Sequence, residues 1–156
     1  MPLKNPIWPV FKMACIGVGR VFSLVMAKER PVKTGNTPVV FVVDDEVMLL
    51  DLAAVILEPE GFEVRTFRDA ETALAEYSKA KPPPCAVITD YAMGAMNGLD
   101  LIRKCRQLHP DQRTILVSGT VDEDIYANVE IKPDCFLSKP YNAEQFVATV
   151  RTLTGY

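Results

Sequence analysis

The amino-acid sequence predicts an α/β protein, a doubly wound five-stranded parallel sheet with helices on both of its faces. Two observations lead to this fold class. From residue 37 onward, segments with the pattern of a strand alternate five times with segments that have the pattern of a helix, as in chains of successive βαβ units. The first strand segment, VVFVV, is apolar at every position, which is expected of a parallel strand that is covered on both faces.

Five short apolar or β-branched runs are the expected strands, at residues 39–43, 62–67, 85–89, 114–117 and 135–137. The run at 62–67 alternates apolar and polar residues, so we expect it nearer to an edge of the sheet. The run at 85–89 is apolar apart from its last residue and leads directly into Asp90. Cys85 and Cys135 lie in these runs, and we interpret them as small core residues.

Apolar residues at helical spacing indicate five helices, at residues 46–60, 69–80, 99–108, 121–131 and 142–153. The apolar stripe of the first is Val47, Leu50, Ala54 and Leu57. That of the third is Leu99, Ile102 and Cys105, and that of the fifth is Phe146, Val150 and Leu153. The segment at 121–131 is acidic and has the weakest periodicity.

Residues that begin or end helices support these boundaries. Gly61 follows the first helix in the position of a C-cap glycine. Asp69 precedes the second as a capping residue. The three prolines at 82–84 end the second helix, and Pro110 follows the third. The single histidine, His109, lies at that helix end, and we interpret it as structural, as we do Met93 and Met96 in the loop after Asp90.

Composition limits the classes of function. A chain of 156 residues allows one domain and an extension, and 49% apolar residues suffice for a packed core. The net charge of -3 offers no basic surface, so we expect no direct binding of nucleic acid. Four widely spaced cysteines, without a Cys-x-x-Cys pair, argue against a zinc site and against a disulfide framework. We therefore expect a reducing, cytoplasmic location.

Residues 1–36 differ from the domain that we expect at residues 37–156. They are basic, with Glu29 as their one acid, and Arg20 separates their two apolar runs. Neither run approaches the roughly 20 apolar residues of a membrane span. We expect a disordered or weakly helical extension, with Met26 as a candidate initiator. A helix that binds a membrane surface or a partner remains the alternative.

Polar side chains follow four of the five expected strands. Asp44 and Asp45 follow the first, Asp90 the third, Ser118 the fourth and Lys139 the fifth. The carboxyl ends of parallel strands meet at one edge of the sheet, and ligands of such folds bind there. We therefore expect three carboxylates, a hydroxyl and an ammonium group to lie close together.

These groups suit a phosphoryl group and a hard divalent cation. Mg²⁺ prefers oxygen ligands, and proteins usually hold it with one or two carboxylates together with phosphate and water. Ser118 and Lys139 can bond phosphoryl oxygens. A carboxylate such as Asp90 can act as the nucleophile in aspartyl-phosphate chemistry. Taken singly, each residue also has a structural explanation, for example Asp44 and Asp45 as caps of the first helix.

The sequence resembles the receiver domain of two-component response regulators over residues 38–153. The matching residues are Asp44 and Asp45, Asp90 with Met93, Met96 and Gly98, Ser118 and Gly119, and residues 136–140, FLSKP. Each motif is weak alone, but all of them occur in order at strand ends. The resemblance implies a flavodoxin-like fold with the strand order 2-1-3-4-5.

The resemblance also implies a role for each acidic residue. Asp90 would be the phosphoacceptor, phosphorylated by a histidine kinase or a histidine phosphotransfer protein. Asp44, Asp45, Asp90 and the backbone carbonyl of Ala92 would be the protein ligands of Mg²⁺, the expected cofactor.

The same comparison implies roles for residues of the last two strands. Ser118 and Lys139 would bind the phosphoryl group, and Ser118 and Phe136 would form the conformational switch. The peptide bond between Lys139 and Pro140 would be cis. The implied output face consists of the fourth helix, the fifth strand and the fifth helix.

We expect a stand-alone receiver that signals by protein contact, because no second domain follows in the 156 residues. It would be a signalling phosphoacceptor that catalyses its own phosphorylation and dephosphorylation, and not an enzyme acting on another substrate. The downstream protein is not identified by the sequence, and phosphorylation-dependent formation of a homodimer is left open. No membrane span is expected.

Two departures from the family pattern bear on these expectations. Gly94 occupies the position where such domains usually have proline, which makes the loop less constrained. The family tunes the lifetime of its phosphate at the positions of Ala92 and Thr120, and neither residue has an acid or an amide to orient water. We therefore hypothesise slow self-dephosphorylation, which hydrolysis within seconds in the absence of a phosphatase would contradict.

Two other functions remain as alternatives. The first is a receiver-like interaction module that does not depend on phosphate, although such a module has no physical need for the acids and the lysine. The second is a phosphohydrolase with an aspartate nucleophile. The pattern typical of those enzymes has a second aspartate two residues after the nucleophile. This chain has Ala92 at that position.

Overall fold

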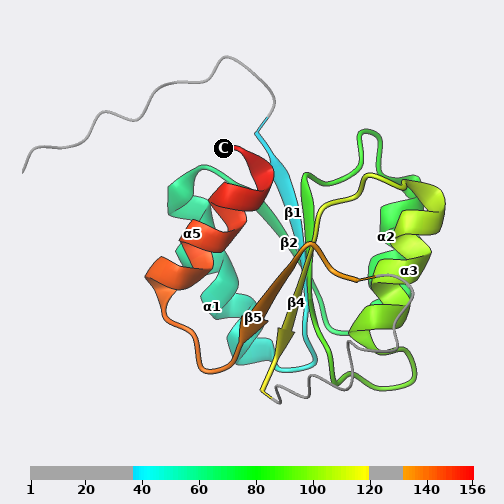
Figure 1. The fold of residues 1–156 in the computed structure, drawn as a ribbon, viewed down its shortest axis with the longest axis horizontal. Helices are drawn as coiled ribbons and strands as arrows, with labels where there is room; N and C mark the ends of the chain where they lie inside the picture. Colours follow the sequence, from blue (N-terminus) through cyan, green and yellow to red (C-terminus); the bar gives the residue numbers. More distant parts are fainter. Residues whose placement is uncertain (1–36, 120–131) are drawn as a thin grey trace, which may run out of the picture. The chain divides into compact units, whose positions relative to one another are not determined.

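The computed structural model describes residues 37–119 and 132–156. In this part of the chain, five parallel strands form one sheet with the order β2-β1-β3-β4-β5 (Figure 1). The strands are β1 (Val39–Val43), β2 (Glu63–Phe67), β3 (Ala86–Asp90), β4 (Thr114–Ser118) and β5 (Cys135–Ser138). The predicted fold class and strand order are confirmed, with the alternating strand β2 at an edge.

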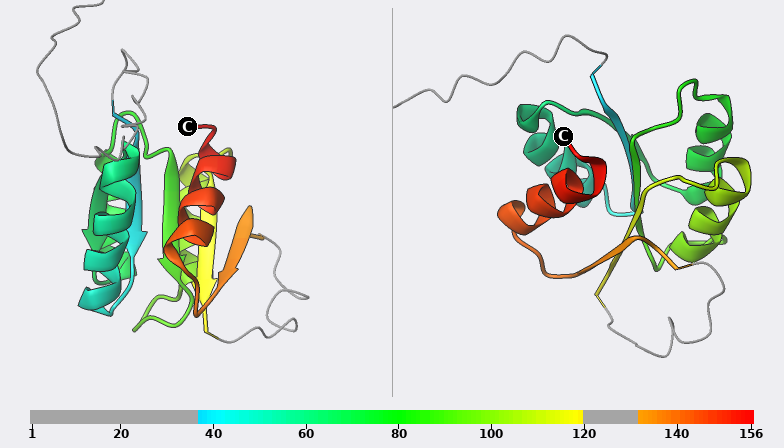
Figure 2. Two further views of the ribbon diagram at one scale, coloured as in Figure 1. Left: turned by 90° about the vertical axis from the view of Figure 1, so that its left-hand side faces the viewer. Right: turned by 45° about the horizontal axis from the view of Figure 1, so that its top comes forward.

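Helices cover both faces of this sheet, as Figures 1 and 2 show. Helices α1 (Val47–Leu57) and α5 (Ala143–Thr154) lie on one face, and α2 (Ala70–Lys79) and α3 (Gly98–Leu108) lie on the other. Two predicted segments, the extension at 1–36 and the helix at 121–131, lie outside the described residues. Within the described ranges, no helix is both long enough and apolar enough to cross a bilayer.

The central strands divide the core into two layers, because successive side chains of a strand point to opposite faces. Toward α1 and α5, the buried residues of the sheet are Val40, Val42, Ile88, Ile115 and Val117. Toward α2 and α3, they include Phe41, Val43 and Val87. Every residue of β3 and β4 is buried, which makes these two strands the most enclosed part of the sheet.

The interpretation of several residues as packing residues can be compared with their burial. Met93 is buried in the layer beneath α2 and α3, and Met96 packs against it, as predicted. Cys85 and Cys135 are only half-buried, although both contact the other core layer. Burial raises the pKa of the Cys85 thiol to about 11 and that of Cys105 to about 12. These two thiols are therefore protonated and unreactive at neutral pH.

Three helix boundaries depend on single residues. Asp69 caps α2 by accepting a hydrogen bond from the backbone N–H of Thr72 at 2.6 Å, as the sequence predicts. Gly61 has a φ of 94° and ends the turn after α1. The predicted helix 46–60 is wrong in its last turn: α1 ends at Leu57, and Glu58–Glu60 form a tighter 3₁₀ turn. Pro59 explains the change, since proline has no N–H to continue an α-helix.

The first helix has apolar residues on its exposed side as well as on its buried side. Leu50, Ala53 and Leu57 point into the core. Val47, which the sequence analysis placed in the same apolar stripe, is 45% exposed, because the buried face is centred on Ala53 instead. With Met48, Leu52 and Val55 it forms an exposed apolar surface, called the α1 outer face below.

A buried polar network joins α2 and α3 to the loops before β3 and β4, at the edge of the sheet where the strands begin. The hydroxyl of Tyr77 donates to Oε1 of Gln112 at 2.8 Å. Nε2 of Gln112 donates to the carbonyl oxygens of Pro84 at 3.1 Å and Arg113 at 3.0 Å. Nδ1 of His109 lies 3.0 Å from the Tyr77 hydroxyl. His109 therefore has the structural role that the sequence predicts.

Replacing Gln112 by alanine should lower the free energy of unfolding by about 1–3 kcal/mol. The substitution removes the acceptor of the Tyr77 hydroxyl and the donor to two carbonyl groups, which leaves buried polar atoms unpaired. Urea unfolding followed by circular dichroism would measure the change. Gln107→Ala on α3, where the glutamine is exposed, is the matched control and should have little effect. Equal effects of the two substitutions would contradict the role of the network.

Candidate functional site

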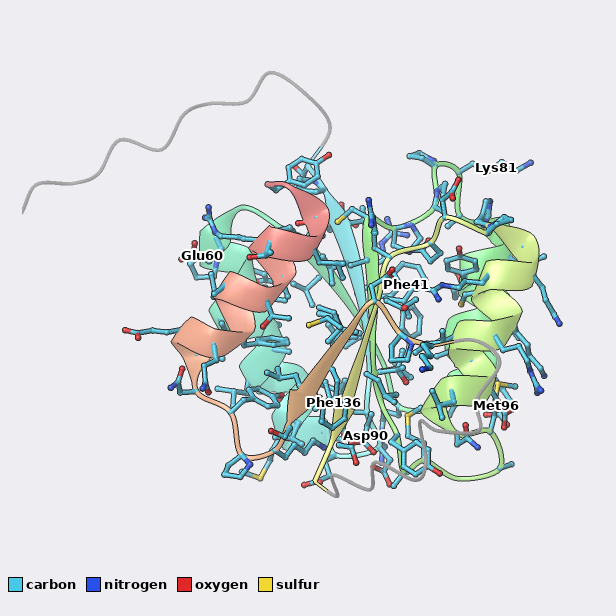
Figure 3. All side chains as sticks on the ribbon, viewed as in Figure 1. Phe41, Glu60, Lys81, Asp90, Met96 and Phe136 are labelled. Atoms are coloured by element: carbon cyan, nitrogen blue, oxygen red, sulfur yellow. The ribbon has the colours of Figure 1, made fainter. Side chains whose placement is uncertain are left out.

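The predicted functional side chains lie at the edge of the sheet where the strands end. Asp44 follows β1, Asp90 is the last residue of β3, and Ser118 is the last residue of β4. Lys139 follows β5. Figure 3 shows Asp90 at this edge. Asp44, Asp90 and Ser118 are 6%, 7% and 4% exposed, so the edge is a buried polar site and not a solvated loop.

Lys139 joins the two buried carboxylates. Its Nζ lies 2.8 Å from Oδ1 of Asp90 and 3.0 Å from Oδ2 of Asp44. Burial alone would lower the pKa of this ammonium group, but its hydrogen bonds to Asp90 and Asp44 and their charges raise it above its ordinary value. Lys139 is therefore a permanent cation between two anions.

The second oxygen of each carboxylate is bonded to the backbone of its own loop. Oδ1 of Asp44 accepts from the N–H of Glu46 at 2.9 Å. Oδ2 of Asp90 accepts from the N–H of Ala92 at 2.8 Å. Both carboxylates are thus held at both oxygens, and the group of Asp44, Asp90 and Lys139 has one negative charge in excess.

Lys139 reaches this pair from β5, although β4 lies between β5 and β3. Its backbone N–H donates to the carbonyl oxygen of Ser118 at 2.8 Å, which fixes the end of β5 against the end of β4. The peptide bond between Lys139 and Pro140 is cis. A second cis bond, between Lys81 and Pro82, was not anticipated from the sequence.

Phe136, the predicted switch aromatic, is half-buried in β5 and pairs in register with Leu116 of β4 (Figure 3). Ser118, its predicted switch partner, pairs with Ser138 at the end of the same two strands. Thr120 lies outside the described residues. The structure therefore shows where the predicted switch residues lie in one conformation of the chain.

The predicted magnesium ligands are only partly brought together. The side chains of Asp44 and Asp90 share Lys139, whereas Asp45 is exposed, as is Ala92. In residues 37–119 and 132–156, no three carboxylate, imidazole or thiol groups are gathered as a ligand set. That Asp45 and the backbone carbonyl of Ala92 bind the metal stays a prediction. The carboxylates of Asp44 and Asp90 offer oxygen ligands, and with Lys139 they have one negative charge in excess. They therefore fit Mg²⁺, which proteins commonly hold with one or two carboxylates.

The geometry of this edge agrees with the comparison of the whole sequence with protein families. A family model described as the response regulator receiver domain matches residues 40–151. The chain belongs to this family. The matched range includes all of β2, β3, β4 and β5 and all but the first residue of β1. It also contains the five predicted polar residues, Asp44, Asp45, Asp90, Ser118 and Lys139.

Two bacterial regulators have sequences similar to this receiver domain. The alkaline phosphatase synthesis transcriptional regulatory protein SphR of Synechococcus elongatus is 32% identical, over 73% of this chain and 48% of its own length. The nitrogen assimilation regulatory protein NtrX of Azorhizobium caulinodans is 34% identical, over 69% of this chain and 24% of its own. The chain therefore spans half or less of the length of these relatives.

Solved receiver structures have the same fold. A CheY-like receiver domain protein from Methanospirillum hungatei superimposes with a TM-score of 0.69 at 25% identity, covering 74% of this chain and 91% of that one. A receiver domain from Clostridium thermocellum gives a TM-score of 0.69 at 27% identity, covering 76% and 94%. Both cover most of the chain beyond the N-terminal extension.

Sequence reasoning did not find two groups that fix the ends of the loop after Asp90. Thr89 donates from its hydroxyl to the backbone carbonyl oxygen of Asp90 at 3.0 Å. Asn97 caps α3 by accepting from the N–H of Asp100 at 2.9 Å, which fixes the far end of the loop. An asparagine just before the helical run at 99–108 was the signal that could have identified this cap.

Replacing Lys139 by alanine should destabilise the receiver domain in the absence of divalent cations. Two carboxylates that are less than a tenth exposed would lose their shared counter-ion, and removing one partner of a buried ion pair costs about 3–5 kcal/mol. Lys79→Ala is the matched control, since its ion pair with Glu76 has the same length but is exposed. That substitution should change the free energy of unfolding by less than about 0.5 kcal/mol. Urea unfolding would measure both, and equal losses would contradict the buried bridge.

Proposed function

We propose that this receiver domain accepts a phosphoryl group on Asp90 and signals by contact with another protein. The observation that carries the proposal is the carboxylate of Asp90, which is buried at the end of β3, bonded to Lys139 and paired through it with Asp44. A nucleophile needs a fixed position and a neighbouring cation to stabilise the charge of the incoming group. The edge of the sheet offers both.

In the proposed step, an oxygen of Asp90 bonds to phosphorus while the bond from phosphorus to the donor histidine nitrogen breaks. The electron pair of that bond stays with the nitrogen. Lys139 and Ser118 bind the phosphoryl oxygens. Bound Mg²⁺, held by Asp44, Asp45, Asp90 and the Ala92 carbonyl, would neutralise the negative charge that gathers there.

After phosphorylation, the phosphoryl group would contact Ser118. This contact would change the orientation of Phe136, the aromatic residue two strands away from Asp90. The receiver would be a phosphoacceptor that promotes its own phosphorylation and hydrolysis, acting in the cytoplasm. Its donor would be a histidine kinase or a histidine phosphotransfer protein.

Phosphorylation by acetyl phosphate tests the proposal directly. Incubation of the full chain with acetyl phosphate and Mg²⁺ should add one phosphoryl group, measured as the intact mass. Asp90→Asn should abolish the adduct, because the amide is not a nucleophile for phosphorus. Asp51→Asn, which changes an exposed acid on α1, is the matched control and should leave the adduct unchanged.

An adduct that forms without Mg²⁺, or one that survives in Asp90→Asn, would contradict the proposed chemistry. A folded wild-type chain that forms no adduct with acetyl phosphate or with any phosphohistidine donor would favour the interaction module that does not depend on phosphate. The two functions therefore predict opposite results in one experiment.

The α1 outer face is the surface that we propose for contact with a protein donor. A phosphohistidine must come within bonding distance of Asp90, so its protein has to cover the edge of the sheet where the strands end. Helix α1 begins at Val47, three residues after Asp44, so its exposed Met48 lies in the turn nearest that edge. Leu52 and Val55 continue the exposed apolar surface along the helix, away from the edge. Contiguous exposed apolar surface is typical of protein–protein contacts.

Leu52→Ser should therefore slow phosphoryl transfer from a protein donor by about tenfold, the effect of losing about 1.4 kcal/mol of contact energy. Its rate of phosphorylation by acetyl phosphate should not change, because the small donor needs no docking surface. Leu108→Ser is the matched control: Leu108 is a leucine of similar exposure, 52% against 46%, at the end of α3. Equal rates for Leu52→Ser and the wild type with the protein donor would exclude this face.

A further inference from the structure

The backbone of Asp90 is enclosed as closely as its side chain. The N–H of the next residue, Tyr91, donates to the carbonyl oxygen of Val117 on β4 at 2.8 Å. The carbonyl oxygen of Asp90 itself accepts from the Thr89 hydroxyl at 3.0 Å. The first residue of α3, Gly98, lies against the same carbonyl group and donates its N–H to the carbonyl oxygen of Tyr91 at 3.1 Å.

Gly98 is a glycine because no space exists for a side chain. A Cβ atom at this position would lie 2.2 Å from the carbonyl oxygen of Asp90, 3.0 Å from its carbonyl carbon and 2.8 Å from Cδ1 of Leu116. Close carbon–oxygen contacts in proteins are about 3.3–3.6 Å. A methyl group at residue 98 would therefore force the backbone of Asp90 and the start of α3 apart by roughly 1 Å.

We propose that Gly98 is a positioning residue for phosphoryl transfer, acting through the backbone carbonyl of Asp90, to whose oxygen Thr89 also donates a hydrogen bond. The proposal rests on the function proposed for Asp90. It assigns to the first turn of α3 the task of fixing where the nucleophile lies relative to Lys139 and Asp44.

The physical step from backbone to side chain is short. The carboxylate of Asp90 is two bonds from its Cα and has contacts of 2.8 Å to Nζ of Lys139 and to the N–H of Ala92. A displacement of about 1 Å exceeds the tolerance of both contacts and is enough to cost on the order of 100-fold in a reaction that depends on position. The chemistry of the carboxylate is unchanged, so only its placement is altered.

Gly98→Ala tests the proposal, and Gly94→Ala is its matched control. Gly94 lies in the same loop, but a Cβ atom there would meet nothing within 4 Å. With acetyl phosphate, the rate constant of Gly98→Ala per folded molecule should fall by about 10- to 100-fold. The Mg²⁺ concentration for half-maximal rate should rise, while Gly94→Ala should match the wild type. A loss of folded protein alone would lower the amplitude but change neither quantity, and that result would overturn the proposal.

A second readout needs neither metal nor phosphate. In the metal-free protein, Gly98→Ala should speed hydrogen exchange at the amides of Tyr91 and Ala92, whose bonds to Val117 and Asp90 depend on the position of β3. Gly94→Ala should not. If the wild type accepts no phosphate, this measurement still tests the positioning of Asp90. Unchanged exchange and an unchanged rate in folded Gly98→Ala would overturn it.

Leu116→Ala separates the two contacts of the added methyl group. Combined with Gly98→Ala, it removes the contact to Cδ1 of Leu116 but leaves the contact to the Asp90 carbonyl. The proposal requires the loss of rate to persist in the double variant, and full recovery would assign the effect to packing. If Gly98→Ala does not fold, Thr89→Val carries the test. Losing the hydroxyl donor to Asp90 should then slow phosphorylation several-fold, and an unchanged rate would overturn the proposal.

Discussion

The site depends on one ammonium group placed between two buried carboxylates. Without it, Asp44 and Asp90 would repel each other, at about 4 kcal/mol for charges 4 Å apart in surroundings of effective dielectric constant 20. The strand order brings this about, because β1 and β3 are neighbours at the point where the winding of the sheet reverses. Lys139 has to reach the pair past the end of β4, and its backbone bond to Ser118 gives its long side chain a fixed origin.

The remainder of the domain keeps this edge in place while leaving it accessible. Every residue of β3 and β4 is buried between two helix layers, so the strands that end in Asp90 and Ser118 are the most enclosed strands of the sheet. At the opposite edge, the network of Tyr77, His109 and Gln112 joins both helices of one face to the loops that begin β3 and β4. Hydrogen bonds where β3 and β4 begin thus help to fix the strands whose other ends position the charged side chains of the site.

The resemblance to the receiver family implied the strand order. Sequence patterns alone predicted the edge strand and the convergence of the polar residues, because these follow from local periodicity and from the geometry of parallel sheets. They could not distinguish Asp44 from Asp45: two identical residues follow β1, and only the direction of each side chain makes one a partner of Lys139 and leaves the other exposed. Val47 was wrongly assigned to the core because α1 is apolar on both sides, so the sequence does not show which side is buried. Gln112 bonds the Tyr77 hydroxyl, 35 residues earlier in the chain, and no local pattern reports such a contact. Gly98 was part of the family motif, but its close approach to the Asp90 carbonyl is visible only in the structure.

The loop after Asp90 shows how position and freedom are divided between neighbouring residues. Gly94 replaces the proline that is usual in the family, and space is open around it. The two ends of the loop are nevertheless fixed, by the bond from Tyr91 to Val117 and by the bond from Gly98 back to Tyr91. A proline at residue 94 would stiffen the span between these anchors without touching Asp90. The backbone of Asp90, the proposed nucleophile, is therefore enclosed by β3, β4 and the first turn of α3, whereas the loop between β3 and α3 has open space at Gly94.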